Sequence, residues 1–277
     1  MATVGELLRR AGDWPGDEAR RDAEVLLGHC LQQPRAWLYA WPEAEVDAGV
    51  QRRFELLLQQ RRQGRPVAYL TGTREFWSLP LAVDEHTLIP RPETETLVAW
   101  ALELPLSATA AVIDLGTGSG AIALAVASER PRWQVLAVDA CPGALRVAAA
   151  NVAATGLQRV TLVRSDWYGA LCGRRFDLLL SNPPYIAEGD PHLELGDVRF
   201  EPRSALVAPG AGLAALRRLV AGAPDHLLDS GWLLLEHGFE QGPAVRVMLR
   251  EAGFSEIATR CDMADRERVT GGQWRAE

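Results

Sequence analysis

The 277-residue sequence predicts an α/β fold, in which a mainly parallel sheet has helices on both faces and follows a small helical domain. Two observations carry this prediction. From Val112 onward, short apolar runs typical of buried strands alternate with stretches of helical character. Before residue 70, apolar residues instead recur at helical spacing, as at Ala23, Leu26 and Leu27. We therefore expect two parts of different architecture in one chain.

A change of pattern separates these two parts. Between Tyr69 and Val83 the sequence becomes aromatic and is broken by Gly72, which predicts a hairpin-like linker. We accordingly divide the chain into a helical domain at residues 1–70, a linker at 71–90 and the sheet domain at 91–277.

A glycine-rich turn follows the first strand of the sheet domain. It comprises Gly116, Thr117, Gly118, Ser119 and Gly120, and it opens a helix. Glycines allow the backbone to approach a ligand closely. The next strand ends in Asp139, where an acid can accept hydrogen bonds from ribose hydroxyls. This pattern predicts a nucleoside-cofactor site. Because Ala121 also completes the dinucleotide fingerprint, a nicotinamide cofactor and S-adenosylmethionine both remain open.

The third strand of this unit favours S-adenosylmethionine. It leads to Ser165, Asp166 and Trp167. The carboxylate of Asp166 could accept from an adenine amino group, and the indole of Trp167 could cover the adenine face. Either residue could equally belong to an ordinary loop or core.

The most informative motif follows the apolar run 176–181. It consists of Asn182, Pro183, Pro184 and Tyr185. The two prolines fix their φ angles and restrict the residues before them, so a stiff loop should stand at the carboxyl end of a strand. Open α/β sheets bind ligands at that end. An amide, free backbone carbonyls and a flat ring together suit a planar nitrogen substrate.

In this order, the motifs resemble class I S-adenosylmethionine-dependent methyltransferases. Two further segments narrow the resemblance: Thr87-Leu88-Ile89-Pro90-Arg91-Pro92-Glu93-Thr94-Glu95 and Phe200-Glu201-Pro202-Arg203-Ser204-Ala205-Leu206. Together with the helical N-terminal region, they are similar to the peptide chain release factor N5-glutamine methyltransferases of the HemK/PrmC type. The resemblance covers nearly the whole chain.

The resemblance implies a Rossmann-like seven-stranded methyltransferase sheet whose last strand is antiparallel. It implies S-adenosyl-L-methionine as cofactor, held by the glycine turn, Asp139, Trp167 and Asn182. The implied substrate is the glutamine of the Gly-Gly-Gln motif in release factors 1 and 2. The segment 182–185 would bind this glutamine: the Asn182 oxygen and the Pro183 carbonyl would accept from its amide nitrogen, while Tyr185 packs on the amide plane. These three residues are the expected catalytic residues, and no general base is expected.

An alternative function is a nucleic-acid amino methyltransferase, of the adenine N6 type, using the same loop. The formal net charge of −7 disfavours it, because enzymes that bind nucleic acid usually carry a basic face. Of Lys and Arg only arginine occurs in the sequence, partly as pairs such as Arg61-Arg62. We therefore expect a protein partner, the release factor, and no direct nucleic-acid contact.

The sequence does not indicate a metal site, a membrane span or a signal peptide. The four cysteines and five histidines lack metal-type spacing, so no metal is expected. No apolar run is long enough to cross a membrane, and the N-terminus does not resemble a signal peptide. We expect a cytoplasmic monomer.

One motif near the end of the chain fits none of these roles. Gly271-Gly272-Gln273 repeats the sequence that the family methylates in its substrates. It is either a coincidence or a pseudosubstrate for self-methylation, and the sequence alone leaves both open.

Overall fold

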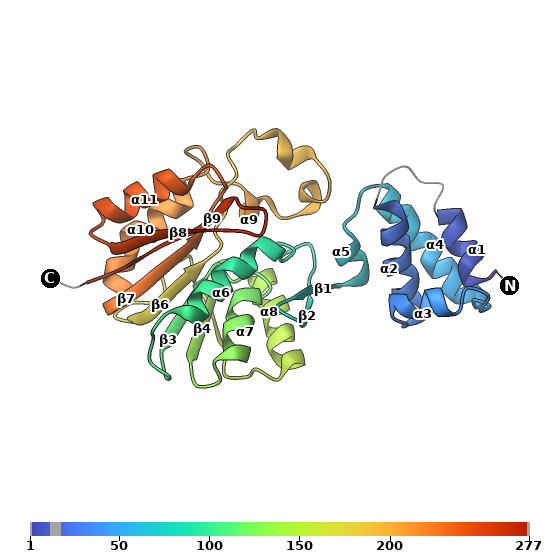
Figure 1. Cartoon of the computed structure of the whole chain (residues 1–277), viewed down its shortest axis with the longest axis horizontal. Coiled ribbons are helices and arrows are strands. Elements are labelled where there is room, and N and C mark those ends of the chain that lie inside the picture. Colours follow the sequence, from blue (N-terminus) through green and yellow to red (C-terminus); the bar gives the residue numbers. More distant parts are fainter. Residues whose placement is uncertain (1, 12–17, 276–277) are drawn as a thin grey trace. The chain divides into compact units, whose positions relative to one another are not determined.

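A computed structural model describes residues 2–11 and 18–275. The chain forms two compact units (Figure 1). The smaller unit contains residues up to Thr73 together with Glu194–Phe200. The larger unit contains Arg74–Leu193 and Glu201–Glu277.

The smaller unit is helical. In its described part the helices are α1 (Val4–Ala11), α2 (Ala19–Leu31), α3 (Arg35–Ala40), α4 (Ala48–Arg62) and α5 (Val67–Thr71). Thr3 and Glu6 form a reciprocal capping box at the start of α1, with backbone-to-side-chain distances of 3.1 and 3.3 Å. Leu27 and Phe54 are among the residues that fill the core between these helices. The predicted helical domain is therefore present.

Residues Glu194–Phe200 belong to this smaller unit although they lie far along the sequence, and the sequence analysis did not anticipate this. Arg61 on α4 binds Asp197 of this segment at 2.7 Å and Asp22 on α2 at the same distance. The Arg61 guanidinium therefore joins helix α2 to the segment Glu194–Phe200.

The predicted hairpin is present at residues 73–82. Strands β1 (Thr73–Phe76) and β2 (Leu79–Ala82) form a two-stranded sheet. Trp77 and Ser78 connect them with φ angles of 50° and 59°. Two successive positive φ values match the twist of a two-residue hairpin, here without the usual glycine.

The larger unit is built on a seven-stranded sheet. Its strands are β3 (Ala111–Leu115), β4 (Gln134–Asp139), β5 (Thr161–Arg164), β6 (Phe176–Ser181), β7 (Leu227–Glu236), β8 (Ser255–Cys261) and β9 (Glu267–Gln273). The strand order is β5-β4-β3-β6-β7-β9-β8. The pairs β3–β4, β3–β6, β4–β5 and β6–β7 are parallel, whereas β9 is antiparallel to both its neighbours. This confirms the predicted sheet and its antiparallel last strand.

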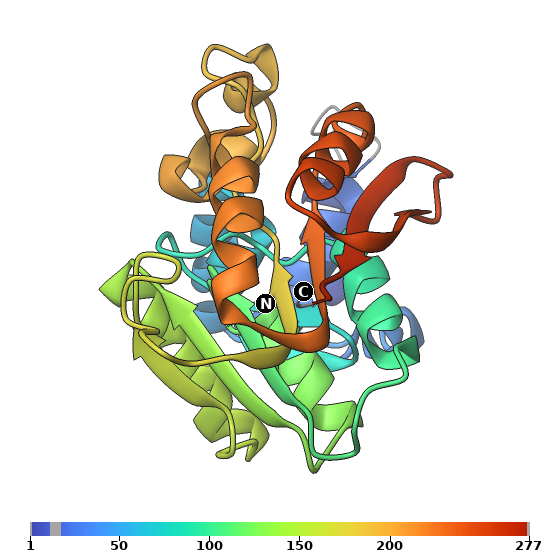
Figure 2. The ribbon, with the colours of Figure 1, turned by 90° about the vertical axis from the view of Figure 1, so that its left-hand side faces the viewer.

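Helices cover both faces of this sheet. The longer ones are α6 (Glu95–Glu103), α7 (Ala121–Glu129), α8 (Pro142–Thr155), α10 (Ala214–His226) and α11 (Gly242–Glu251). Short helical segments of the larger unit are α9 (Arg203–Leu206) and the 3₁₀ turn η1 (Pro92–Thr94). The 3₁₀ turn η2 (Pro191–Glu194) ends at the first residue of the segment that belongs to the smaller unit, and η3 (Val198–Phe200) lies within that segment. Side chains alternate between two cores: Leu178 packs with residues of α6 and α7, and Leu179 packs with residues of α10 and α11. Figure 2 shows the two helix groups in green and in orange to red. None of the helices in the described ranges combines the length and apolar character needed to cross a membrane.

Candidate functional site

A cavity of about 610 Å³ opens in the larger unit where β3, β4 and β6 end. This is the edge at which parallel α/β sheets bind ligands, and the volume suits a ligand of nucleoside size. Of the predicted site residues, the cavity is lined by Gly116, Thr117, Gly118, Ser119, Asp139, Trp167, Asn182 and Pro184. Gly120, Pro183 and Tyr185 lie outside this lining. The sequence motifs therefore converge on one place.

The glycine turn is built from backbone in the left-handed region. Gly116, Gly118 and Gly120 have φ angles of 77°, 56° and 86°. A Cβ on Gly116 would stand 3.2 Å from the Trp167 ring, whereas one on Gly118 would meet no atom of the described residues within 4 Å. Both the conformation and the close approach to Trp167 require glycine at position 116.

A buried carboxylate supports this turn from below. Asp114 is fully buried, and its Oδ2 accepts from the Thr117 hydroxyl at 2.6 Å and from the Ala123 backbone at 3.3 Å. Burial raises the pKa of Asp114 to about 7, against these two hydrogen bonds. The Thr117 hydroxyl thus points at Asp114, and the Thr117 side chain orients the glycine turn.

Asp139 ties the turn to the next helix. Its Oδ2 accepts from the Gly118 backbone at 2.9 Å, and its Oδ1 accepts from the Cys141 backbone at 2.8 Å, just before α8. Each carboxylate oxygen has a second lone pair. The side chain can therefore hold the turn to the backbone before α8 and still accept from a ligand hydroxyl.

Trp167 and Asp166 occupy the wall expected for adenine. Trp167 has φ 52° and lies with its ring against Gly116. Both carboxylate oxygens of Asp166 bind Arg218 on α10, at 3.0 and 2.8 Å. All three line the cavity. The carboxylate is thus already paired, and an adenine amino group would share it with a guanidinium.

Asn151 on α8 is a support that the sequence analysis missed. It is buried, and its Nδ2 donates to the carbonyls of Ser119 at 2.8 Å and Ala82 at 3.0 Å. Its Oδ1 accepts from the Ala82 backbone at 2.6 Å. One side chain therefore joins the hairpin to the glycine turn. A single Asn inside an alanine-rich helix was the available signal.

The Asn-Pro-Pro-Tyr loop directs its members to different places. Asn182 and Pro184 line the cavity, Pro183 is buried, and the Tyr185 hydroxyl donates to Glu236 Oε1 at 3.3 Å. The Tyr185 carbonyl accepts from Gln241 at 3.0 Å. Burial and the neighbouring carboxylate raise the pKa of Tyr185, so the phenol stays protonated.

Thr94 and Glu236 stand directly behind this loop and were also missed. Asn182 Nδ2 donates to Thr94 Oγ1 at 3.2 Å. Glu236, at the end of β7, is 1% exposed. Thr94 lies within the segment that carries the family resemblance, and Glu236 ends an apolar strand. The sequence positions of these two residues indicated that they could matter, but not what they contact.

The resemblance segments also meet in an ion pair. Arg91 binds Glu201 Oε1, and Glu201 Oε2 accepts from the Ile89 backbone at 3.1 Å. Glu201 is buried. The segment that begins the sheet domain is thus fastened to the segment after the loop, beside the cavity wall that Leu88 and Pro90 supply.

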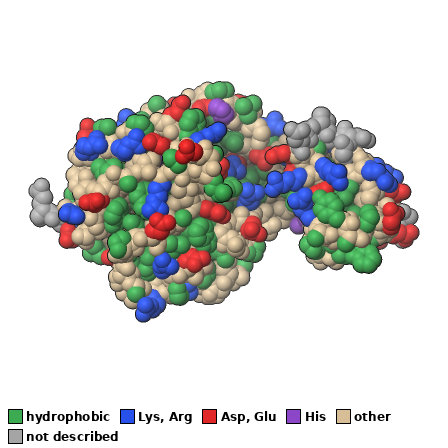
Figure 3. Space-filling model, viewed as in Figure 1, with side chains coloured by type: hydrophobic (Ala, Val, Ile, Leu, Met, Phe, Trp, Pro, Cys, Tyr) green, Lys and Arg blue, Asp and Glu red, His purple; other side chains and the backbone are tan. Residues whose placement is uncertain are grey.

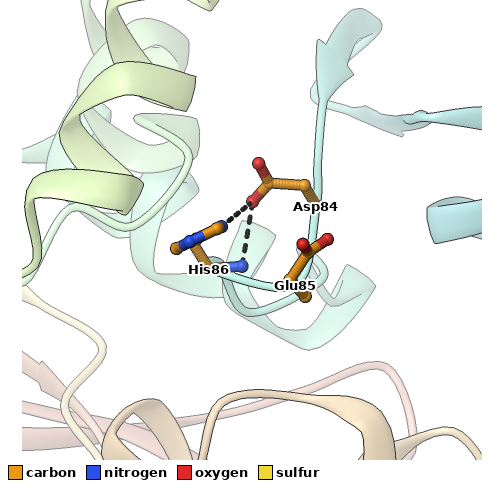
Figure 4. A group of neighbouring side chains, drawn as sticks. All are labelled: Asp84, Glu85 and His86. Carbon is orange, nitrogen blue, oxygen red and sulfur yellow. Dashed lines mark hydrogen bonds and ion pairs between the residues drawn. The ribbon is translucent and has the colours of Figure 1, made fainter.

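Three consecutive residues near the rim, Asp84, Glu85 and His86, bring possible metal-ligand atoms within 4.8 Å of one another (Figure 4). Asp84 Oδ1 accepts from the His86 backbone at 2.9 Å and lies 3.3 Å from His86 Nδ1. This is the bonding of an Asx turn. We assign the cluster to turn formation and no metal to it.

The Gly-Gly-Gln sequence of this chain lies inside the sheet. Gly271 and Gly272 are buried in β9 and pair with Leu234 and Leu233 of β7. A Cβ on Gly271 would stand 2.3 Å from the Leu234 side chain. The glycines therefore serve close packing between strands, and the half-buried Gln273 ends β9 with its side-chain amide donating to the Ser230 carbonyl at 3.0 Å.

Comparison with known proteins decides the family. The PrmC N-terminal domain matches residues 3–72, and the methyltransferase small domain matches residues 94–213. A release factor glutamine methyltransferase of Pseudomonas aeruginosa is 51% identical over 274 residues, which cover 99% of each chain. The chain belongs to the release factor glutamine methyltransferase family.

A second member of this family, from Vibrio cholerae, is 49% identical over 278 residues, covering 100% of this chain and 96% of that protein. Among solved structures, a methyltransferase from Pyrococcus furiosus aligns with a TM-score of 0.55 at 16% identity, covering 83% of this chain and 100% of that one. At that identity the likeness shows the fold alone. The family resemblance and the methyltransferase fold inferred from the sequence are thereby confirmed.

Proposed function

We propose that this protein transfers a methyl group from S-adenosyl-L-methionine to the side-chain amide nitrogen of the glutamine in the Gly-Gly-Gln motif of peptide chain release factors. The observation that carries the proposal is the convergence of the glycine turn and the Asn182 amide on one cavity, in a chain of this family. Such modification would support translation termination.

The residues present fit the cofactor. The open space above Gly118 lets a ligand reach the backbone, the Trp167 ring forms a flat wall, and Asp139 keeps lone pairs for ribose hydroxyls. When bound, S-adenosylmethionine supplies a methyl group on a positively charged sulfur. We propose the glycine turn, Asp139, Trp167 and Asn182 as its contacts.

Asn182 would hold the acceptor amide. Its contact with Thr94 uses the amide nitrogen, so the carbonyl oxygen Oδ1 is available to accept from a substrate amide. Together with the Pro183 carbonyl, it would stabilise positive charge developing on the substrate nitrogen. Tyr185 would pack on the amide plane. The methylated nitrogen becomes acidic, so no general base is needed before attack.

The smaller unit is proposed to recognise the body of the release factor. The division into residues 1–70, 71–90 and 91–277 stays a prediction. Large apolar side chains on it are exposed, including Tyr39, Trp41 and Leu56. Such residues are common in binding surfaces. Release factors 1 and 2 as the substrates, a monomeric enzyme and a cytoplasmic location remain predictions.

The charge of the protein does not support the alternative substrate, which is an amino group of a nucleic acid. The chain carries a net charge of −7, and on the face of the larger unit in Figure 3 basic and acidic side chains are interspersed. A nucleic-acid groove would gather arginines to neutralise phosphates.

The test supplies methyl-labelled S-adenosylmethionine to the full chain with purified release factor, unmethylated DNA or RNA as separate acceptors. We expect label on the release factor alone. Label on nucleic acid alone would replace the proposal with the alternative function.

A further inference from the structure

The carbonyl of Tyr185, the last residue of the Asn-Pro-Pro-Tyr loop, is bound by a side chain from outside the motifs of the sequence. Gln241 directly precedes α11, and its Nε2 donates to the Tyr185 carbonyl at 3.0 Å and to the Ala211 carbonyl at 3.3 Å. Its Oε1 accepts from the Gly238 backbone at 2.9 Å. One side chain thus joins the loop after β6 to the segment before α10 and to the turn after β7.

These three bonds fix which way round the Gln241 amide lies. An amide nitrogen has two hydrogens to donate, whereas an amide oxygen only accepts. The end that faces two carbonyls must therefore be the nitrogen, and the end that faces the Gly238 N–H must be the oxygen. A carboxylate of the same shape could still accept from Gly238, but it would have no hydrogen to give to the two carbonyls.

The backbone at Gly212 also lies against the Tyr185 carbonyl. Gly212 has a φ angle of 80°, and a Cβ there would clash with the Tyr185 oxygen. Both the conformation and the close approach therefore require glycine. Gly210, two residues earlier, has a φ angle of 64°, but the nearest described atom to a Cβ there would be Nη1 of the flexible Arg217 side chain, at 3.3 Å.

The loop depends on such contacts with its neighbours. Pro183 and Pro184 have no backbone hydrogen to donate, so they cannot hold the loop through their own N–H groups. Just beyond the loop, the Ile186 backbone donates to the Leu206 carbonyl at 2.9 Å, and the Ile186 carbonyl accepts from the Ala208 backbone at 2.9 Å. These bonds hold the chain that follows the loop, whereas Gln241 acts on Tyr185 itself.

We propose that Gln241 is a positioning residue for methyl transfer. By binding the Tyr185 carbonyl, it sets where the Tyr185 ring and the Pro183 carbonyl meet the acceptor amide. Gln241 lies outside the cavity lining, so it acts through Tyr185 and not by touching the ligands. The inference rests on the proposed function, which makes Tyr185 and Pro183 the contacts of the substrate glutamine.

The first test changes one end of the Gln241 amide. Gln241→Glu keeps an acceptor for Gly238 but loses both donors, and a negative oxygen then faces the Tyr185 carbonyl. At pH 8 we expect kcat for methyl transfer to release factor to fall by about tenfold to a hundredfold, because the acceptor loses its alignment. The affinity for S-adenosylmethionine should fall much less, because the glycine turn, Asp139 and Trp167 are unchanged.

The matched control is Gln273→Glu. Gln273 is half-buried like Gln241, and its Nε2 also donates to a backbone carbonyl, that of Ser230 at 3.0 Å. The same substitution there removes the same kind of donor from the sheet and not from the loop. We expect a similar change in the urea unfolding midpoint of both variants, with kcat lowered only in Gln241→Glu. Equal kcat in the two variants would overturn the proposal.

A second pair of variants changes the other neighbour of the Tyr185 carbonyl. Gly212→Ala places a Cβ against that oxygen, whereas Gly210→Ala imposes a similar backbone strain without this contact. We expect kcat to fall at least tenfold further in Gly212→Ala than in Gly210→Ala, by the same loss of alignment. Equal kcat in the two would overturn the proposal, and this pair decides if Gln241→Glu does not fold.

A third measurement does not depend on the acceptor. The chain has four tyrosines, so fluorotyrosine labelling gives four ¹⁹F signals, and Tyr185→Phe identifies the signal of Tyr185. We expect Gln241→Glu to shift that signal and Gln273→Glu to leave it in place. A Tyr185 signal that does not move in Gln241→Glu would overturn the proposal. A shifted signal in an enzyme that leaves release factor unlabelled would instead refute only the proposed function.

Discussion

The two halves of the cavity are built in different ways. The cofactor half is made mainly of backbone: Gly116, Gly118 and the carboxylate that joins them to the next helix come from one βαβ stretch. The acceptor half is made of side chains from segments more than fifty residues apart: Asn182 is bonded to Thr94, and Tyr185 of the same loop is bonded to Glu236. A site made of local backbone leaves a contiguous motif in the sequence, whereas a site made of distant side chains does not.

The largest expected effect separates these halves. Asn182→Ala removes the proposed acceptor for the substrate amide, and we expect kcat to fall by about 10²- to 10³-fold, the range for losing one group that stabilises developing charge. The affinity for S-adenosylmethionine should fall much less than kcat, because the variant loses one proposed cofactor contact while the glycine turn, Asp139 and Trp167 remain. Methyl transfer and calorimetry on the same preparation check this. A parallel loss of both would mean that the halves are not separable.

A change in the cofactor half should instead weaken the binding of S-adenosylmethionine. Gly116→Ala forces a Cβ to 3.2 Å from the Trp167 ring at a φ of 77°. We expect about a tenfold weaker Kd for the cofactor, corresponding to a strain of about 1–2 kcal/mol. Gly156→Ala, at φ 70° with open space around it, is the control for conformational strain alone. Equal affinity in both variants would contradict the role of the Trp167 contact.

This contrast explains how far sequence reasoning reached. The sheet, its glycine turn and the Asn-Pro-Pro-Tyr loop were predictable because periodicity and turn chemistry are local. Asn151, Thr94 and Glu236 were not, since their roles depend on which distant backbone or side chain they face. The placement of Glu194–Phe200 in the smaller unit likewise depends on a pairing between Arg61 and Asp197 that no local pattern encodes.

The support that Asn151 gives to the glycine turn can be measured through the free energy of unfolding. Asn151→Leu would leave the Ala82 and Ser119 carbonyls without their buried donor, so we expect the free energy of unfolding to drop by about 2 kcal/mol. Urea unfolding of the two proteins tests this value. An unchanged midpoint would show that the hairpin and the glycine turn are held by other contacts.

The smallest expected effect concerns Asp114 and depends on pH. Its pKa is raised to about 7, while in the unfolded chain it should ionise near about 4. The folded state therefore binds the proton more strongly, and the contribution of Asp114 to stability falls as the pH rises from about 4 to about 7. Asp114→Asn, which can still accept from Thr117, should be about 1 kcal/mol more stable than wild type at pH 8.

At pH 4 the same pair of proteins should unfold with nearly equal free energies, because the aspartate is then protonated in the folded state. A stability difference that does not vary with pH would show that Asp114 keeps an ordinary pKa.

The most direct test of the account is to locate the transferred methyl group. Release factor incubated with the wild-type enzyme and S-adenosylmethionine would be digested and its Gly-Gly-Gln peptide sequenced by tandem mass spectrometry. We expect one added methyl group on the glutamine side chain, present with wild type and nearly absent with Asn182→Ala. A methyl group on another residue, or equal methylation by both enzymes, would contradict the assignment of the acceptor half.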